Sequence, residues 1–243
     1  MSLRIVEDAL VEGIRVLKIS LVEANPVSEK EALAWLRDEA ELSRWKKCLP
    51  QARWYFSFCR AALRKILCDT LNCRNEQLSF EYSYYGKPYA LVDNKPANIA
   101  FNVSHSGKLG VIAVAPTGSL GVDVEAIVLK RQIETLIDTV MGDEERAELR
   151  QLQGAAKLRR FFRLWACKEA LIKALGTGCH TDISKFQIPV DIRKGETTTA
   201  TFRFPHLPAV SWQLKDLSGR EYATALAYEL PTKRPPTEPE NHH

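Results

Sequence analysis

The chain contains 243 residues with a formal net charge of +4, and 45% of the residues are hydrophobic and 26% are charged. This length allows a sizeable core without metal or disulfide staples, and the composition lies far from the disordered and fibrous classes. The longest apolar stretch, residues 109–115, is too short to cross a bilayer, and Glu7 and Asp8 stand where a signal peptide is apolar. We therefore expect a globular protein that is neither secreted nor embedded in a membrane.

Six cysteines are spread along the chain, and none forms a Cys-x-x-Cys pair. The one close pair, Cys68 and Cys73, has no histidine nearby, so a zinc site is not expected. Most cysteines lie among apolar or helix-forming neighbours, where a free thiol acts as a small hydrophobe. The sequence thus favours a cytoplasmic protein, because thiols stay reduced in the cytoplasm.

The first half of the chain predicts a strand, two helices and three further strands. Ser28 and Glu31 form a capping-box pattern at the start of the first helix. Gly107-Lys108 predicts a hairpin between the last two strands. The expected ranges are a strand over Ile14–Ser20, helices over 28–40 and 53–71, and a three-strand meander over Leu78–Tyr82, 99–103 and 109–114.

The second half repeats this order, with a strand, helices and an antiparallel set of strands. Gly176 and Gly178 end its longest helix. The expected ranges are strands over 120–124, 186–190, 200–204, 212–217 and 222–228, and helices over 143–153 and 157–175. We infer an α+β fold of two similar lobes, residues 1–117 and 118–230, each a small, mainly antiparallel sheet packed with a long helix. The proline-rich residues 231–243 predict a disordered tail.

Positive charge is concentrated between Leu42 and Arg74, a segment that contains eight basic residues and one acidic residue, Asp69. Such a segment creates a local positive field that suits an anionic partner, which could be a phosphorylated cofactor, an acidic protein or nucleic acid. A solvated helix surface explains the segment as well. The basic residues are Arg44, Lys46, Lys47, Arg53, Arg60, Arg64, Lys65 and Arg74.

Asp123 and Glu125 are the first candidates for chemistry, in the sequence Gly-Val-Asp-Val-Glu over 121–125. Because side chains alternate along a strand, the two carboxylates point to one face and the two valines to the other. Carboxylates held side by side repel unless a cation lies between them, and Mg²⁺ that serves a nucleotide takes oxygen ligands of this kind. Taken alone, the pattern also fits an exposed strand face or a salt-bridge cluster.

The helix over 161–175 carries the second group of candidates. At about 3.6 residues per turn, Glu169 and Lys173 fall opposite its apolar stripe. They form an i,i+4 pair whose commonest use is a minor surface salt bridge. Lys168 lies at the edge of the stripe, where its ammonium must reach solvent or meet an anion, and a phosphate would satisfy it.

His105 ends a predicted strand in the sequence Phe-Asn-Val-Ser-His-Ser over 101–106. A lone histidine at a strand end is most often structural. No nucleophile elbow or Asp-His-Ser order surrounds it, so phosphate contact is a better functional interpretation than a hydrolase triad. Gly86-Lys87-Pro88, which follows two tyrosines, by itself indicates only a turn.

Taken together and in this order, the four motifs resemble those of the Sfp-type phosphopantetheinyl transferases, a two-lobed family that activates carrier proteins of polyketide, nonribosomal peptide and fatty acid synthesis. The resemblance extends from about residue 44 to residue 177. It comprises the Gly-Lys-Pro turn, the Asn-Val-Ser-His-Ser strand, the Gly-Val-Asp-Val-Glu strand and the Trp-x-x-Lys-Glu-Ala-x-x-Lys helix that starts at Trp165. The family implies the pseudo-twofold, two-lobed fold with a metal site at the lobe interface.

The resemblance also implies a role for each motif residue. Asp123, Glu125 and Glu169 would hold Mg²⁺. The other residues would bind coenzyme A: Lys168 and Lys173 at the pyrophosphate or the pantetheine arm, His105 with Ser104 beside it and Arg53 at the 3′-phosphate, and Tyr85, Gly86, Lys87 and Pro88 beside the adenine.

The implied reaction moves 4′-phosphopantetheine from coenzyme A to a serine of an apo acyl- or peptidyl-carrier protein and releases 3′,5′-ADP, without a covalent enzyme intermediate. Glu169 would accept the serine proton, directly or through a water molecule, and Asp123 and Lys173 complete the expected catalytic group. The expected partners are coenzyme A and the carrier protein, neither nucleic acid nor a membrane, and the expected state is a monomer.

Two other classes of function use similar residues. A metal-dependent phosphodiesterase or nucleotidyl transferase also needs grouped carboxylates and a lysine, and would release product without a carrier protein. A non-catalytic module that binds nucleotides or acidic proteins would bind without turnover. Nucleic-acid binding is disfavoured because the basic residues occupy one segment without a recognised motif.

Overall fold

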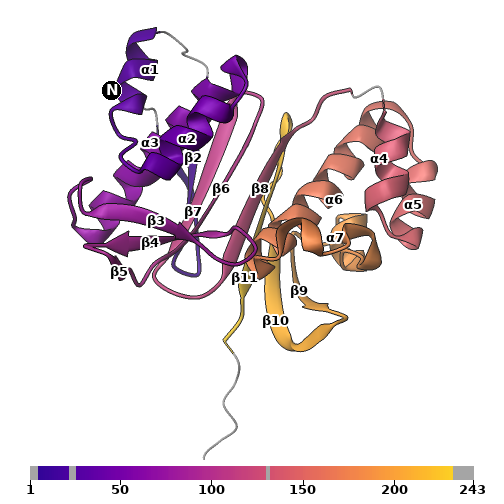
Figure 1. The fold of residues 1–243 in the computed structure, drawn as a ribbon. Coiled ribbons are helices and arrows are strands. Elements are labelled where there is room, and N and C mark those ends of the chain that lie inside the picture. Colours follow the sequence, from indigo (N-terminus) through magenta and orange to yellow (C-terminus); the bar gives the residue numbers. More distant parts are fainter. Residues whose placement is uncertain (1–4, 22–25, 130–131, 232–243) are drawn as a thin grey trace, which may run out of the picture.

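The computed structural model describes residues 5–21, 26–129 and 132–231. These residues form an N-terminal and a C-terminal α+β lobe that lie side by side (Figure 1). Each lobe combines a four-stranded antiparallel sheet with one 22-residue helix, α3 (Pro50–Leu71) in the first and α6 (Gly154–Leu175) in the second. The predicted fold class is therefore confirmed.

The sheet of the N-terminal lobe has the strand order β1-β2-β7-β6. In the turn between residues 106 and 109, Gly107 takes a φ of +56°, a conformation that L side chains rarely adopt. The strands on either side of this turn pair antiparallel, so the predicted hairpin is confirmed. The strands are β1 (Ile5–Val11), β2 (Ile14–Ser20), β6 (Ala100–Ser106) and β7 (Leu109–Ala115).

Two short helices, α1 (Pro26–Leu33) and α2 (Glu39–Lys47), pack on α3. The helix predicted over 28–40 is confirmed over 28–33 and wrong beyond Leu33, because Asp38 and Glu41 form a capping box that starts a new helix. The apolar face of α3, with Phe58 and Leu67, meets Phe101 and Ile112 of the sheet in the core of this lobe.

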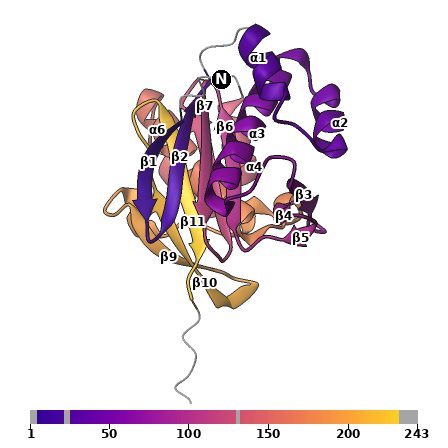
Figure 2. The same ribbon diagram turned by 90° about the vertical axis from the view of Figure 1, so that its left-hand side faces the viewer.

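Three short strands, β3 (Leu78–Tyr82), β4 (Pro88–Val92) and β5 (Lys95–Pro96), form a separate sheet, set apart from β1 and β2 (Figure 2). The predicted meander is therefore wrong at its first strand, because β3 pairs with β4 and not with β6. Asp93 and Asn94 take φ values of 49° and 60° in the β4–β5 turn, the conformation of a tight hairpin that the prediction overlooked.

The C-terminal lobe has the sheet order β8-β11-β10-β9 and most of its helices on one side (Figure 1). Its strands are β8 (Leu120–Ala126), β9 (Thr199–Phe204), β10 (Leu207–Asp216) and β11 (Tyr222–Glu229). Its shorter helices are α4 (Ile133–Val140), α5 (Asp143–Arg150) and α7 (Val190–Lys194), with single 3₁₀ turns at Gly178–His180 and Ile183–Lys185. In the C-terminal lobe, the long helix α6 comes after the first strand along the chain, whereas in the N-terminal lobe the long helix α3 comes after the second strand. Both lobes therefore pack a sheet against a long helix, but they connect these elements in a different order.

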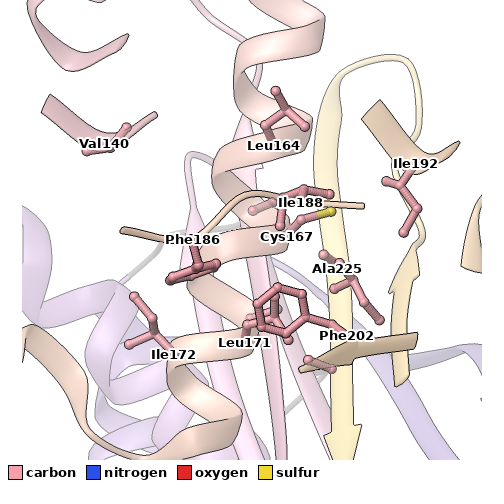
Figure 3. Packing of buried hydrophobic residues seen from close by; sticks show 14 of the residues in the cluster. Val140, Leu164, Cys167, Leu171, Ile172, Phe186, Ile188, Ile192, Phe202 and Ala225 are labelled. Carbon is pink, nitrogen blue, oxygen red and sulfur yellow. The ribbon is translucent and has the colours of Figure 1, made fainter. Parts of the chain in front are cut away.

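The prediction of a strand over 186–190 is wrong. Phe186 and Ile188 are buried in the core of the C-terminal lobe, beside Leu171 and Phe202 (Figure 3). The backbone N–H of Ile188 donates to the Glu145 carboxylate at 2.8 Å instead of to a neighbouring strand. The apolar alternation in this segment therefore reflects burial of an irregular chain, which periodicity alone does not distinguish from a strand.

A third core joins the two lobes. Val16 and Val111 of the N-terminal sheet pack with Val122 and Leu226 of the C-terminal sheet, and all four are buried. The lobes are thus held together by apolar packing as well as by the chain that connects them. None of the helices in the described ranges is long and apolar enough to cross a bilayer. The five cysteines whose side chains are described, residues 48, 59, 68, 73 and 167, are free thiols.

Candidate active site

The two large sheets meet where β6 runs beside β8, and side chains bridge this seam. Alternate side chains of β6 accept hydrogen bonds from the backbone N–H groups of β8, a pattern that replaces the main-chain ladder of a continuous sheet. The pairs are Asn102 Oδ1 with Val122 N at 3.0 Å, Ser104 Oγ with Val124 N at 3.3 Å, and Ser106 Oγ with Ala126 N at 3.0 Å. We call this set of contacts the β6–β8 ladder.

The same two serines also hold the carboxylates of β8. Ser104 donates to Asp123 Oδ1 at 2.7 Å, and Ser106 donates to Glu125 Oε2 at 3.0 Å. Asp123 is only 3% exposed, and its other oxygen, Oδ2, is buried without a hydrogen-bond partner in the described structure. The ladder therefore fixes the position of both carboxylates that the sequence singled out.

Helix α6 lies directly on β8 because Gly121 has no side chain. A Cβ at this position would lie 2.2 Å from the backbone oxygen of Ala170, so any other residue would push the helix away. This close approach brings Lys173 over the strand, where its Nζ donates to Asp123 Oδ1 at 2.6 Å and to Ser104 Oγ at 2.9 Å. The glycine of the motif is thus needed for the packing.

Glu169 lies one turn before Lys173 on the same helix and is half-buried. Burial raises the pKa of its carboxyl, and the nearby carboxylates Asp123 and Glu125 raise this pKa further, against the opposing charge of Lys173. The structure therefore brings the three predicted metal ligands and Lys173 into one electrostatically coupled group at the lobe interface.

The donor set of this group suits a hard cation such as Mg²⁺, since it consists of carboxylate oxygens, and one of them, Asp123 Oδ2, is an orphaned buried atom. Yet among the described residues no three His, Cys, Asp or Glu side chains stand in the arrangement of a metal site. Lys173 supplies the positive charge that Asp123 faces in this structure. The residues fit a cation chemically, and ligation would require side-chain movement.

A cavity of about 270 Å³ lies in the N-terminal lobe beside this group. Arg60 is 8% exposed, and its Nη1 is buried without a hydrogen-bond partner in the described structure, although its Nε lies 3.3 Å from Glu41 Oε1. A buried guanidinium nitrogen without a partner is costly, and an anionic ligand would satisfy it. The lining residues that matter here are Arg44, Arg60, Gly86, Pro88 and His105.

His105 stacks on Tyr55 of α3, with ring centroids 5.9 Å apart, while its other side is exposed. Desolvation lowers the pKa of this histidine, and the charge of Lys173 lowers it further, against the opposing charge of Asp123. The predicted residues His105, Gly86 and Pro88 thus share one cavity with two arginines.

Arg53 has a different environment from the one predicted. Its guanidinium donates to the backbone oxygens of Cys48 at 3.1 Å and Lys46 at 2.8 Å and lies over the Trp45 ring. It therefore braces the junction between α2 and α3 and does not line the cavity.

Lys168 also departs from its predicted place. It is fully buried, its Nζ lies 2.7 Å from Glu145 Oε2, and Glu145 is fully buried as well. The ammonium donates in addition to the backbone oxygens of Val140, Ile183 and Phe186. The anion that this lysine meets is thus the carboxylate of Glu145 on α5, and no donor remains for a phosphate.

Sequence reasoning missed the roles of Arg60, Arg44, Asn102 and Ser106. Arg60 and Arg64 counted only as part of a basic segment, yet Arg64 is fully buried and lies 3.0 Å from Glu41 Oε2. Part of the expected positive surface is therefore neutralised inside the lobe. The alternation of Asn102, Ser104 and Ser106 at every second strand position was the one available signal for the β6–β8 ladder.

Comparisons with known proteins relate both halves of the chain to one family. Residues 119–227 match the profile of the 4′-phosphopantetheinyl transferase superfamily, and residues 38–117 match that of the N-terminal region of 4′-phosphopantetheinyl transferases. The 4′-phosphopantetheinyl transferase HetI of Nostoc sp. is 33% identical over 194 residues, which cover 79% of this chain and 78% of HetI. The chain belongs to the 4′-phosphopantetheinyl transferase superfamily.

Two further relatives match shorter stretches. The protein slr0495 of Synechocystis sp. is 35% identical over 148 residues, 61% of this chain and 59% of that protein. The 4′-phosphopantetheinyl transferase gsp of Aneurinibacillus migulanus is 32% identical over 142 residues, 58% of this chain and 54% of gsp. The matched regions thus span less than two thirds of slr0495 and gsp and more than three quarters of HetI.

Within this phosphopantetheinyl transferase fold, the two matched regions are separated only by Gly118, in the connection between β7 and β8. The N-terminal region contributes the cavity with Arg60 and His105, and the C-terminal region contributes Asp123, Glu169 and Lys173. The candidate site therefore depends on both regions.

Proposed function

We propose that the protein transfers 4′-phosphopantetheine from coenzyme A to a serine of an apo acyl- or peptidyl-carrier protein and releases 3′,5′-ADP. One observation carries this proposal: carboxylates suited to bind a cation lie beside a cavity that is suited to bind an anion. In the first, Asp123 Oδ2 is buried without a partner, and in the second, Arg60 Nη1 is buried without a partner in the described structure. Coenzyme A carries both kinds of group that this arrangement suits, a pyrophosphate and a separate 3′-phosphate. The family membership supports the same reaction.

The proposed metal ligands are Asp123, Glu125 and Glu169. Mg²⁺ bound to them would offset the charge of the pyrophosphate. Lys173, which now neutralises Asp123, would then be available to contact a phosphate oxygen. These assignments rest on the donor set and on the repulsion that raises the pKa of Glu169.

Glu169 is the proposed general base. Its half-buried carboxylate lies one turn before Lys173 on α6, close enough to Asp123 for the two charges to interact. It would take the proton of the carrier serine while the serine oxygen forms a bond to the phosphorus that bears the pantetheine arm. The bond between that phosphorus and the bridging oxygen breaks, and 3′,5′-ADP leaves with the electron pair. Lys173 would stabilise the charge that develops on the leaving group.

The nucleotide end of coenzyme A would occupy the cavity of the N-terminal lobe. Arg60 and Arg44 would bind the 3′-phosphate together with His105, and they replace Arg53 in the assignment. The adenine would lie against Gly86 and Pro88, which line the same cavity. Ser104 belongs to the site through its hydrogen bonds to Asp123 and Lys173.

The carrier protein would approach beside α2, whose exposed face carries Arg44, Lys46 and Lys47. Carrier proteins of these pathways are typically acidic around the modified serine, so this face would speed their association. Lys65 contributes less, because it lies 3.2 Å from Asp69 on the same helix.

The decisive test is incubation of the protein with Mg²⁺, coenzyme A and a panel of apo-carrier proteins, followed by intact mass spectrometry. Each accepted carrier should gain the mass of one phosphopantetheine group only when enzyme, coenzyme A and metal are all present, and the Asp123→Asn variant serves as the control. Release of 3′,5′-ADP without any carrier would instead indicate a phosphodiesterase. A folded protein that binds coenzyme A and modifies no carrier in the panel would refute the proposal.

A further inference from the structure

Lys87 connects the two lobes at the start of β8, two residues before Val122 of the β6–β8 ladder. It lies in the turn between β3 and β4 of the N-terminal lobe. Its Nζ donates to the backbone oxygen of Leu120 on β8 at 2.9 Å and to that of Ala174 on α6 at 3.0 Å. Both acceptors belong to the C-terminal lobe, so this single side chain crosses the lobe boundary.

The C-terminal end of α6 is suited to receive this ammonium. The last carbonyls of a helix have no partner within the helix, and the negative end of the helix dipole favours a cation. Gly176, with a φ of +80°, ends the helix and donates its N–H to Ile172 O. A Cβ at Gly176 would lie 3.2 Å from Lys87 Cδ, so the lysine stem packs against this glycine.

Desolvation at the same place lowers the pKa of Lys87 to about 8. A partly buried ammonium is tolerated where hydrogen-bond acceptors surround it, and here two carbonyls serve that purpose. The structure gives this lysine no carboxylate partner among the described residues. The contact is therefore a helix cap formed across the lobe boundary.

The turn that carries Lys87 is itself well fixed. Ser83 N donates to Lys87 O at 2.9 Å, Lys87 N donates to Ser83 Oγ at 3.1 Å, and Gly86 takes a φ of +84°. The neighbours Gly86 and Pro88 line the proposed nucleotide cavity, and Lys87 is not part of that lining. Lys87 instead lines, together with Pro88, a second cavity of about 340 Å³.

We propose that Lys87 is a positioning residue that sets the distance between the nucleotide-binding turn and the reacting groups on α6. Its acceptor Ala174 directly follows Lys173, and Glu169 lies little more than one turn earlier on the same helix. A shift of the turn relative to α6 would move the phosphorus of bound coenzyme A away from Glu169. A misplacement of about 1 Å can cost on the order of a hundredfold in rate.

This inference rests on the proposed transfer reaction. Two kinds of measurement distinguish a failure of the positioning role from a failure of the transfer reaction. Lys87→Met keeps most of the stem and removes the ammonium, Lys87→Arg restores donors, and Lys95→Met removes an exposed lysine from the same small sheet. Steady-state transfer should show a kcat about tenfold or more lower in Lys87→Met, with the Kd for 3′,5′-ADP within about threefold of wild type. Lys87→Arg should recover part of kcat, and Lys95→Met should match wild type.

Hydrogen exchange of the unliganded protein gives a readout that needs no turnover. Amides over 83–88 and at the end of α6 should exchange faster in Lys87→Met than in Lys95→Met. Unchanged exchange, a loss of 3′,5′-ADP affinity as large as the loss of kcat, or a loss of activity that only follows unfolding would each overturn the positioning role. Faster exchange in a protein whose wild type modifies no carrier would refute the transfer reaction and leave the interlobe contact standing.

Discussion

Replacing Lys168 with methionine should destabilise the C-terminal lobe and leave coenzyme A binding by the folded protein unchanged. The methionine fills a similar volume but leaves the fully buried carboxylate of Glu145 without its cation. Breaking a buried ion pair by removing one partner costs about 3–5 kcal/mol. The loss also removes the donor from three backbone oxygens, those of Val140, Ile183 and Phe186.

For a chain of this length, each kcal/mol lowers Tm by about 2–4 °C, so Lys168→Met should lower Tm by about 6–20 °C. The double variant Lys168→Met/Glu145→Gln should recover part of this loss. Glutamine carries no charge, and its oxygen can still accept from one of the two backbone N–H groups, those of Gly142 and Ile188, that bond to Glu145. Lys65→Met is the matched control, because it breaks an exposed pair worth at most about 1 kcal/mol.

Urea and thermal unfolding would measure the stability of each variant, and calorimetry well below Tm would measure coenzyme A binding. A Lys168→Met protein with wild-type stability and a coenzyme A affinity at least tenfold weaker would refute the structural role and restore the phosphate contact implied by the sequence.

Three further predictions concern the site itself. Asp123→Asn should lower transfer on the order of a hundredfold or more, and near-normal turnover at ordinary Mg²⁺ concentration would remove this residue from the site. Arg60→Leu should raise KM for coenzyme A but not for dephospho-coenzyme A, since only the first carries the 3′-phosphate, and equal effects on both would contradict the assignment. The pKa of folded His105 lies below its ordinary value of 6.5, so the unfolded chain binds more protons as pH falls through that value. Acidification should therefore cost wild type more unfolding free energy than His105→Ala, and equal pH dependence in the two proteins would contradict the lowered pKa of His105.

The motif residues were predictable because strand and helix geometry alone determines much of their arrangement. Alternation along β8 places Asp123 and Glu125 on one face, and the i,i+4 spacing places Glu169 and Lys173 on one side of α6. What the sequence could not supply was the partner of each charge. The position of Lys168 indicated that its ammonium reaches solvent or meets an anion, and it meets the carboxylate of Glu145, 23 residues earlier in the chain.

The same limit explains the other errors. Arg60 shares a cavity with His105 only through the packing of α3 on the sheet, and nothing in the local sequence of either residue indicates this contact. Phe186 and Ile188 alternate like strand residues because both are buried, yet their backbone bonds elsewhere. The periodicity of apolar residues indicates which side chains are buried, but it does not indicate which groups the backbone hydrogen-bonds to.

The β6–β8 ladder also bears on how such a protein could be divided. The seam between the lobes depends on polar side chains, among them Asn102, Ser104 and Ser106, and on an apolar core, not on a continuous main-chain ladder. A chain cut within residues 116–119 would therefore keep both large sheets intact while separating His105 from Asp123. Transfer activity would return only when the fragments reassociate in the correct register, so the cut protein would act as a complementation reporter whose signal requires both halves.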